Sequence, residues 1–294
     1  MIKEARLSPG PGFKPLHAAL YYGMRLVPNY TIRRCTAWTL AKTVCAFKAA
    51  SSPAEAAEPL AELRRNGIAT IAPIFSQAQL EEITGYLRDR PVAAPDGREY
   101  RLGEIPSGTR LASYPLGTIL ECPHLLEALN REDVLSMATD YLGARPLISA
   151  TRVDCAFPTG GAPADVQRFH RDYDDWRFFK LFVYLTDTDL EEGPHEFVRT
   201  SHRYSGRLRA NAFSADYIAE RYGPDAVVRQ CGPRGTSFVA DTWGIHRGSP
   251  PRNHVRMLFQ ATYSLLQTYK FEYHPIRTQR AGRFDRRINR LLMA

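Results

Sequence analysis

The sequence changes character near residue 147, and this change limits the folds that the chain can adopt. Upstream, apolar residues recur mostly at helical spacing, whereas downstream to residue 266 short strand-like runs dominate, namely FKLFVYLTD, HEFVRTS, GTSFVAD and RMLFQATYSLL. A helical pattern around 213–222 interrupts these runs. Helices followed by a series of short strands predict an α+β protein with a β-barrel or jelly-roll core. With 294 residues, the chain is long enough to bury one such core.

Local signals predict several elements in the first half of the chain. SSPAEAAEPLAELRRNG predicts a helix that ends at Gly67, and IATIAPIF after it predicts a strand. Ser76 and Gln79 form the sequence signature of a capping box, which marks the start of another helix. Helical segments over 123–142 should stop at Gly143, after which LISATRVDCAFP alternates in the manner of a strand.

Positive charge is concentrated at the two ends of the chain. The whole sequence has a net charge of +8, but residues 1–50 alone carry +7 and residues 270–294 carry +5, so the segment between them is acidic. We therefore expect a basic amphipathic helical extension (1–50), a central domain (51–269) and a basic C-terminal tail (270–294). The basic ends suggest an anionic partner, although charge that only keeps the protein soluble would give the same pattern.

Residues 14–50 mix apolar and basic residues at approximately helical spacing on both sides of Pro28, which predicts two short amphipathic helices. Such helices commonly pack against a core, but they could also cap a site, form a dimer contact or lie on an anionic membrane surface. No apolar run is long enough to span a bilayer and no secretory-signal pattern is present, so we expect a cytoplasmic protein. The five cysteines are scattered and odd in number, so we expect reduced, structural thiols.

Three residues could form a metal site. In QRFHRDYDDW, His170 and Asp172 are two positions apart, so on an extended backbone both side chains leave the same face. His246, just past a strand-like run, can supply a third ligand. Two histidines and one carboxylate suit non-haem Fe(II) and leave positions open for 2-oxoglutarate and O2. Asp174 and Asp175 could replace Asp172 but are less suitably placed along the strand, and a buried polar network is the non-catalytic alternative.

An arginine downstream could hold the co-substrate. Arg256 follows His246 at the start of the strand-like run RMLFQATYS, where a guanidinium could bind the distal carboxylate of 2-oxoglutarate through two hydrogen bonds. Arg252 is the competing candidate. We prefer Arg256 because a strand fixes its side chain better than the PPRN turn fixes Arg252.

The order of these motifs resembles the phytanoyl-CoA dioxygenase family of Fe(II)- and 2-oxoglutarate-dependent oxygenases. The family pattern is His-x-Asp, then a strand and a Gly-rich turn ending in Ser-His, then a distal His followed by Arg. Here these elements read HRD, KLFVYLTDTDLEEGPHEFVRTSH and GIHRGSPPRNHVR, within 141–264. The resemblance implies a double-stranded β-helix (cupin-like jelly-roll) core, with the N-terminal helices packed outside it. It assigns iron to His170, Asp172 and His246, and the 2-oxoglutarate carboxylate to Arg256.

The resemblance also implies that Phe182 and Gly248 line the co-substrate pocket. Gly248 stands where a serine is often found, so the contact of that hydroxyl is absent or supplied elsewhere. The implied reaction of the 51–269 domain is oxidation of an unactivated C–H bond in a small or carrier-linked anionic substrate, such as a sugar, lipid or secondary metabolite, with release of succinate and CO2. Because position 172 carries Asp and not the small residue of related halogenases, hydroxylation is the expected outcome.

Residues beside the ligand motifs suggest how a substrate could bind. We expect a basic and aromatic mouth, with some side chains pointing away, formed by Arg168, Arg171, Trp176, Arg177, Trp243 and Arg247. His202 should make a structural hydrogen bond. His195, in EEGPHEF, either faces the substrate or, as we prefer, holds the turn.

Two other classes of function compete with the enzyme. A β-helix of this kind could be a non-catalytic ligand-binding or scaffold protein, but the full set of three ligands with Arg256 argues against that. Nucleic-acid binding is motivated by the basic ends. We do not expect it, because the sequence has no recognition helix, zinc finger or aromatic-rich RNA motif.

Overall fold

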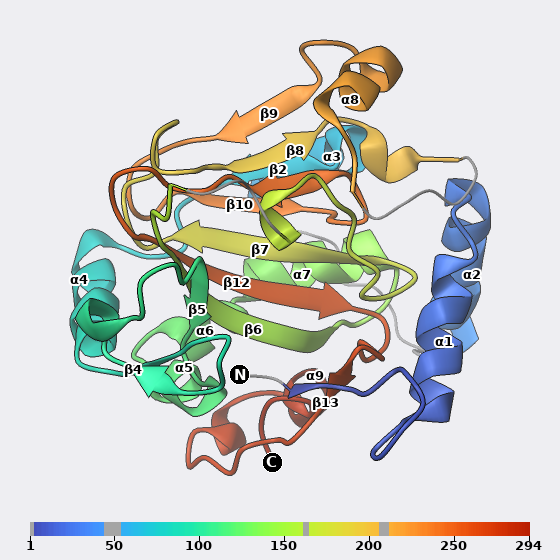
Figure 1. Cartoon of the computed structure of the whole chain (residues 1–294). Coiled ribbons are helices and arrows are strands. Elements are labelled where there is room, and N and C mark those ends of the chain that lie inside the picture. The colour runs from blue at the N-terminus through green and yellow to red at the C-terminus, as the bar shows by residue number, and fades with distance from the viewer. Residues whose placement is uncertain (1–2, 44–53, 161–164, 206–211) are drawn as a thin grey trace.

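Two antiparallel sheets face one another in the computed structural model of the protein, which describes residues 3–43, 54–160, 165–205 and 212–294 (Figure 1). The major sheet has the strand order β2-β10-β7-β12-β6-β5-β3-β4, and the minor sheet has the order β11-β8-β9. Their strands are β2 (Ile68–Ile71), β3 (Val92–Ala93), β4 (Glu99–Tyr100), β5 (Leu111–Ser113), β6 (Leu147–Ala156), β7 (Phe178–Tyr184), β8 (His195–Val198), β9 (Val227–Gln230), β10 (Ser237–Ala240), β11 (His246–Gly248) and β12 (Arg256–Ser264). A third sheet pairs β1 (Lys3–Glu4) with β13 (Phe271–Glu272) and so joins the two ends of the chain.

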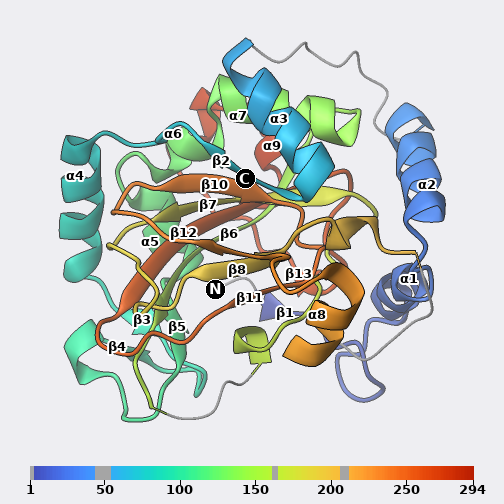
Figure 2. The same cartoon turned by 90° about the horizontal axis from the view of Figure 1, so that it is seen from above.

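Helices cover the outer face of the major sheet and one edge of the molecule, and α8 packs beside the minor sheet (Figures 1 and 2). Figure 2 shows α3, α6 and α7 over that face, while the minor sheet lies on the opposite side. The helices are α1 (Pro15–Arg25), α2 (Tyr30–Thr43), α3 (Ala54–Asn66), α4 (Gln77–Arg88), α5 (Leu116–Glu121), α6 (Leu125–Leu129), α7 (Glu132–Leu142), α8 (Ala215–Tyr222) and α9 (Arg286–Asn289), with short 3-10 turns η1 (Leu102–Glu104), η2 (Asp165–Gln167), η3 (Ser201–Arg203) and η4 (Ala281–Arg283). The predicted α+β class with a jelly-roll core and external helices is confirmed.

Residues of β7 alternate between two apolar cores. Phe179 and Leu181 lie in the main core, between the major sheet and the helices. Phe182 and Tyr184 point the other way, into a smaller core between the two sheets that also contains Phe197 of β8. Burial of one such side chain contributes about 1.5–3 kcal/mol relative to exposure. A one-residue slip would exchange the two sets, so this packing fixes which β7 residues face the space between the sheets.

The predicted helix signals are confirmed. Ser76 and Gln79 form a complete capping box at the start of α4. Gly67 and Gly143 follow α3 and α7 with φ of +85° and +79°, a left-handed conformation that favours glycine. The predicted strand IATIAPIF is shorter than expected and ends at Ile71.

The N-terminal segment packs against the rest of the molecule. Helices α1 and α2 lie on either side of Pro28, as predicted, and Ala37 and Ala41 of α2 belong to the main core. Arg33 is buried and donates to the backbone carbonyls of Met24 and Asp175. Residues 44–50 of the predicted amphipathic segment, and the predicted boundary after residue 50, lie outside the described residues.

None of the helices in the described ranges has both the length and the apolar composition that spanning a bilayer would require. The four described cysteines, Cys35, Cys122, Cys155 and Cys231, are all free thiols, as predicted.

Candidate metal centre and co-substrate cavity

Two segments far apart in the sequence run antiparallel and bring the predicted ligands together. His170 and His246 form an isolated bridge with backbone hydrogen bonds of 2.9 and 3.0 Å, and the Asp172 N–H donates to the Thr242 carbonyl at 2.9 Å. The centroids of the two imidazole rings are 4.3 Å apart. The backbone pairing therefore fixes the relative positions of all three side chains.

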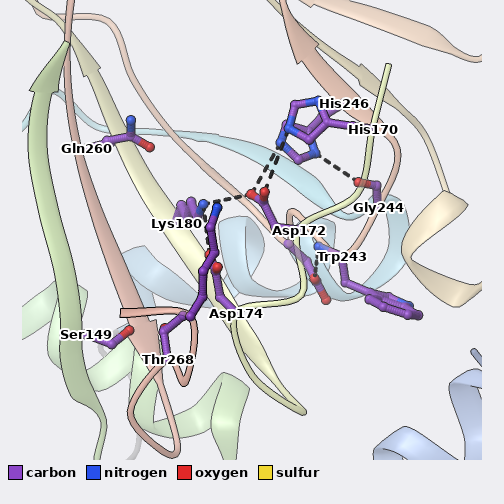
Figure 3. A network of polar contacts seen from close by, with 12 residues as sticks. Ser149, His170, Asp172, Asp174, Lys180, Trp243, Gly244, His246, Gln260 and Thr268 are labelled. Atoms are coloured by element: carbon purple, nitrogen blue, oxygen red, sulfur yellow. Dashed lines mark hydrogen bonds and ion pairs between the residues drawn. The ribbon is translucent and has the colours of Figure 1, made fainter. Parts of the chain in front are cut away.

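The ligand atoms of the three side chains converge on one point. His170 Nε2 lies 3.7 Å from Asp172 Oδ1, and His246 Nε2 lies 3.4 Å from Asp172 Oδ2. One donor atom from each of the three residues lies within 4.8 Å of the others (Figure 3). This spacing suits one metal ion bound by two nitrogens and one oxygen.

Both imidazoles are oriented by a second hydrogen bond. The Nδ1 atom of His170 lies 2.8 Å from the Arg168 carbonyl, and that of His246 lies 3.0 Å from the Gly244 carbonyl. A carbonyl can only accept, so these contacts place the proton on Nδ1 and leave Nε2 as a lone-pair donor. Both rings thus present the tautomer that a metal requires.

The charges at the centre also suit a cation. Burial, together with the neighbouring His246, lowers the pKa of His170 to about 4, so its imidazole is neutral at neutral pH. Burial would raise the pKa of Asp172, but Lys180 and His246 hold it well below its usual range. A neutral imidazole beside an ionised carboxylate is the protonation state of a metal-binding set.

Lys180 is a neighbour of the centre that our sequence analysis missed. Its Nζ lies 2.7 Å from Asp172 Oδ2 and 3.0 Å from Asp174 Oδ2 (Figure 3). Burial would lower the pKa of Lys180, but the two carboxylates raise it above its ordinary value. Lys180 is the only charged residue in the β7 sequence FFKLFVY, and it lies two positions before Phe182, so it shares that residue's face. This isolated charge in an apolar strand was the sequence signal that could have identified Lys180.

The alternative carboxylates do not join the donor set. Asp174 is held by Lys180, and Asp175 accepts hydrogen bonds from the backbone N–H groups of Trp176 and Leu266. Burial raises the pKa of Asp175 to about 7. Within the described residues, Asp172 is the carboxylate that meets both histidines.

A cavity of about 170 Å³ opens beside the three ligands. The predicted co-substrate residues Phe182, Gly248 and Arg256 all line it. Arg256 is 7% exposed, donates one hydrogen bond of 3.3 Å to the Ser249 carbonyl, and leaves its Nε without a partner among the described residues. Burial lowers the pKa of Arg256, yet a guanidinium stays protonated at neutral pH. A buried cation with unused donors is suited to a carboxylate ligand.

Gly248 and Arg256 are in close proximity. A Cβ atom at position 248 would lie 3.0 Å from Arg256 Nη2, which is closer than an ordinary contact. The glycine at this position therefore leaves space for the guanidinium. The serine often found at the matching position of the resembling family would need Arg256 to shift.

The structure also places Arg252 and His195, for which the sequence left two roles open. Arg252, the competing candidate for the carboxylate, has a 73% exposed side chain paired with Glu191 at 2.7 Å, and it does not line the cavity. His195, which we expected to hold its turn, instead lines the cavity, with its ring centroid 4.8 Å from that of Phe182 and 5.5 Å from that of His246. Our preferred role for His195 was therefore wrong.

His202 makes the structural hydrogen bond that we predicted, with its Nε2 lying 3.3 Å from the Arg64 carbonyl.

The prediction of a basic and aromatic substrate mouth beside the ligands is wrong. None of its six residues lines the cavity within the described chain: Arg168, Arg171, Trp176, Arg177, Trp243 and Arg247. Arg171 is buried and donates to the carbonyls of Ser201 and Trp243. Arg247 pairs with Glu196 at 2.9 Å. Arg171 and Arg247 each lie one position after a ligand histidine along extended backbone, so their side chains point to the other side of it.

The polar wall of the cavity comes instead from β6 and β12. Arg152 and Gln260 are register partners on these strands, and both hydrogen-bond the carboxylate of Asp154, at 3.0 and 2.5 Å. Lys270 also lines the cavity. The alternation of β6 places Arg152 and Asp154 on one face, but no spacing in the sequence links them to the ligand motifs.

Comparisons with known proteins support the fold. No protein-family model and no curated protein matches the sequence. Among solved structures, HygX from Streptomyces hygroscopicus, crystallised with nickel, 2-oxoglutarate and hygromycin B, is similar with a TM-score of 0.54 and 16% identity over 74% of this chain and 90% of HygX. EctD from S. alaskensis, with 2-oxoglutarate and 5-hydroxyectoine, gives a TM-score of 0.53 and 19% identity over 74% of this chain and 78% of EctD.

A third structure is SnoK, a non-haem α-ketoglutarate-dependent carbocyclase from nogalamycin biosynthesis, with a TM-score of 0.51 and 17% identity over 72% of this chain and 87% of SnoK. At these identities the likeness concerns the fold. The chain therefore has the jelly-roll fold of non-haem 2-oxoglutarate-dependent enzymes, which is the fold that its resemblance to the phytanoyl-CoA dioxygenase family implies.

Proposed function

We propose that the protein is an Fe(II)- and 2-oxoglutarate-dependent oxygenase that hydroxylates a C–H bond of a small molecule. One observation carries the proposal: two imidazole Nε2 atoms and an ionised carboxylate converge beside a cavity that contains a buried arginine. The iron ligands would be His170, Asp172 and His246. When bound, Fe(II) supplies the coordination positions at which 2-oxoglutarate and O2 react, with release of succinate and CO2.

The cavity residues would orient the co-substrate. Arg256 would bind the distal carboxylate of 2-oxoglutarate through its free donors, and Gly248 keeps the space that this guanidinium needs. The rings of Phe182 and His195 contact each other at a tilt of 37°, with centroids 4.8 Å apart, and form an aromatic wall of the cavity. These contacts would hold the keto acid in one orientation, which lowers the entropic cost of reaction.

Lys180 would act as a positioning residue. Its ammonium contacts the Asp172 oxygen that also faces His246 Nε2, and it is itself held by Asp174. The lysine thus restricts the rotation of the carboxylate and keeps it ionised.

The substrate would be a small polar molecule that carries an anionic group. The cations that line the cavity outnumber the carboxylates by four to three: Arg152, Lys180, Arg256 and Lys270 against Asp154, Asp172 and Asp174. Arg256 is assigned to 2-oxoglutarate, and Lys180 is held by Asp172 and Asp174. The other cations on the wall are Arg152, which pairs with Asp154, and Lys270, which pairs with Glu4 at 3.3 Å, and these two would contact a substrate. HygX and EctD were crystallised with small polar molecules, which supports the size class.

The test of the metal site is calorimetric titration of the apoprotein with Fe(II) or Co(II) under anaerobic conditions. We expect one site per chain in the wild type, abolished in His170→Ala because one of three ligands is lost. The matched control is His274→Ala, which removes an exposed histidine outside the cavity and should bind metal normally. Equal metal binding in His170→Ala would contradict the assignment, and a wild type that binds no metal would favour the non-catalytic ligand-binding or scaffold alternative.

A further inference from the structure

A second cavity, of about 360 Å³, lies on a different side of the fold. It shares no lining residue with the metal cavity among the described residues. Its walls come from α2, the end of α3, α7, η3 and the residue before β7, and its main lining residues are Tyr30, Arg34, Arg64, Tyr141, Arg177 and Arg203. Arg177, predicted for the substrate mouth, therefore belongs to this second cavity.

The four arginines converge on this cavity without a carboxylate to neutralise them. Within the described ranges, no Asp or Glu lines it, and no ion pair involves any of the four guanidinium groups. Asp241 lies in the adjoining hollow, where it accepts hydrogen bonds from the Tyr141 hydroxyl and the backbone N–H of Trp243. Elsewhere on the surface, arginines have acidic partners, such as Arg280 with Glu127 at 2.6 Å.

Neutral groups hold the arginines in place. Arg64 donates to the Asp140 carbonyl at 2.7 Å, and Arg203 donates to the Arg64 carbonyl at 2.6 Å. The Arg177 guanidinium lies over the ring of Tyr141, 4.5 Å from its centroid. The two hydrogen bonds use one donor each of Arg64 and Arg203. Arg34 and Arg177 make no hydrogen bond to a described residue, so most donors of the four guanidinium groups are left for a ligand. The tertiary structure therefore places four positively charged side chains around one cavity. A bound anion would reduce the repulsion between them.

We propose that this cavity binds a phosphoryl group. Guanidinium groups match the oxygens of a phosphate through paired, charge-assisted hydrogen bonds, and several of them around one hollow suit a ligand with multiple negative charges. Both a soluble phosphate ester and the headgroup of an anionic lipid carry this chemistry.

The surface beside the cavity has features that suit contact with a lipid bilayer. Trp38 lies one helical turn after Arg34 on α2 and is 64% exposed, and Ile32 is 55% exposed. Neither α1 nor α2 contains an acidic residue, and Figures 1 and 2 show the two helices following one another along one edge of the molecule. An exposed indole beside a cationic hollow is the arrangement that contacts a lipid interface.

The test uses the full-length protein with two probes. Inorganic pyrophosphate is titrated by calorimetry, and vesicles of phosphatidylcholine with or without phosphatidic acid are sedimented with the protein. The variants are Arg34→Gln, Arg34→Gln combined with Arg177→Gln, and, for the vesicle assay, Trp38→Ala. Arg252→Gln is the control, because it removes an exposed arginine far from this cavity in the fold. Circular dichroism checks that each variant is folded, and Arg34 has no hydrogen-bond or ion-pair partner among the described residues that its loss would disturb.

We expect each Gln substitution to weaken binding about tenfold, as the loss of one charge-assisted hydrogen bond would, while Arg252→Gln binds as the wild type does. Pyrophosphate binding with this dependence identifies a soluble phosphate ester as the source. Binding only to vesicles with phosphatidic acid, weakened by Arg34→Gln and by Trp38→Ala, identifies a lipid headgroup. Binding of neither probe, or equal binding in wild type and the double variant, would overturn the proposal.

Discussion

Replacement of Arg256 with Gln should separate co-substrate binding from metal binding. Arg256 is buried, and its only hydrogen bond to a described residue is the one to the Ser249 carbonyl, so most of its donors are available to a ligand. Two charge-assisted hydrogen bonds to a carboxylate contribute about 1.5–3 kcal/mol each. Because 1.4 kcal/mol corresponds to a factor of ten, their loss should raise the Kd of 2-oxoglutarate at least about a hundredfold.

The assay is calorimetric titration of 2-oxoglutarate into the Co(II)-loaded protein, with a parallel metal titration. The metal affinity of Arg256→Gln should equal that of the wild type, because no atom of Arg256 belongs to the donor set. Arg252→Gln is the control for loss of one positive charge and should leave both affinities unchanged. Unchanged 2-oxoglutarate affinity in Arg256→Gln, or a comparable loss in Arg252→Gln, would refute the reasoning.

Two further substitutions test other parts of the account. Gly248→Ala should raise the Kd of 2-oxoglutarate about tenfold, because its Cβ would lie 3.0 Å from Arg256 Nη2 and displace the guanidinium; titration of the metal-loaded variant checks this, and unchanged affinity would contradict it. Asp175→Asn should change the pH dependence of stability. Burial raises the pKa of Asp175 to about 7 in the folded state, above its value in the unfolded state. The wild type should therefore lose stability as the pH rises from the unfolded pKa to the folded pKa of this residue. The loss should reach up to about 4 kcal/mol, and the variant should lack it. Urea denaturation across the interval measures the slope, and parallel slopes for the two proteins would contradict the prediction.

Much of the candidate metal centre could be predicted from the sequence because its geometry is local or follows from chain order. The two-residue spacing of His170 and Asp172 places both side chains on one face of extended backbone, and the structure has them there. The strand signals of RMLFQATYS correctly favoured Arg256 over Arg252 for the cavity. The fold class followed from periodicity in the same way.

The remaining parts depend on how distant segments meet. Lys180 contacts Asp172 only because the face of β7 that carries the lysine points towards the loop before this strand. A single lysine in an apolar strand does not identify its partner. The prediction of a basic mouth was wrong because Arg171 and Arg247 directly follow ligand residues in the sequence. Their side chains therefore point to the opposite side of the backbone. Charge composition alone could not reveal that Arg177 joins an arginine cavity built from separate elements.

The central claim is that His170, Asp172 and His246 hold a catalytic iron beside a 2-oxoglutarate site. Its most direct test is anaerobic loading with Fe(II), followed by exposure to O2 and 2-oxoglutarate without a substrate, with succinate measured by mass spectrometry. The account predicts succinate formation that requires Fe(II), persists in His274→Ala and is lost in His170→Ala. Iron-loaded wild-type protein that forms no succinate, or equal formation in His170→Ala, would contradict it.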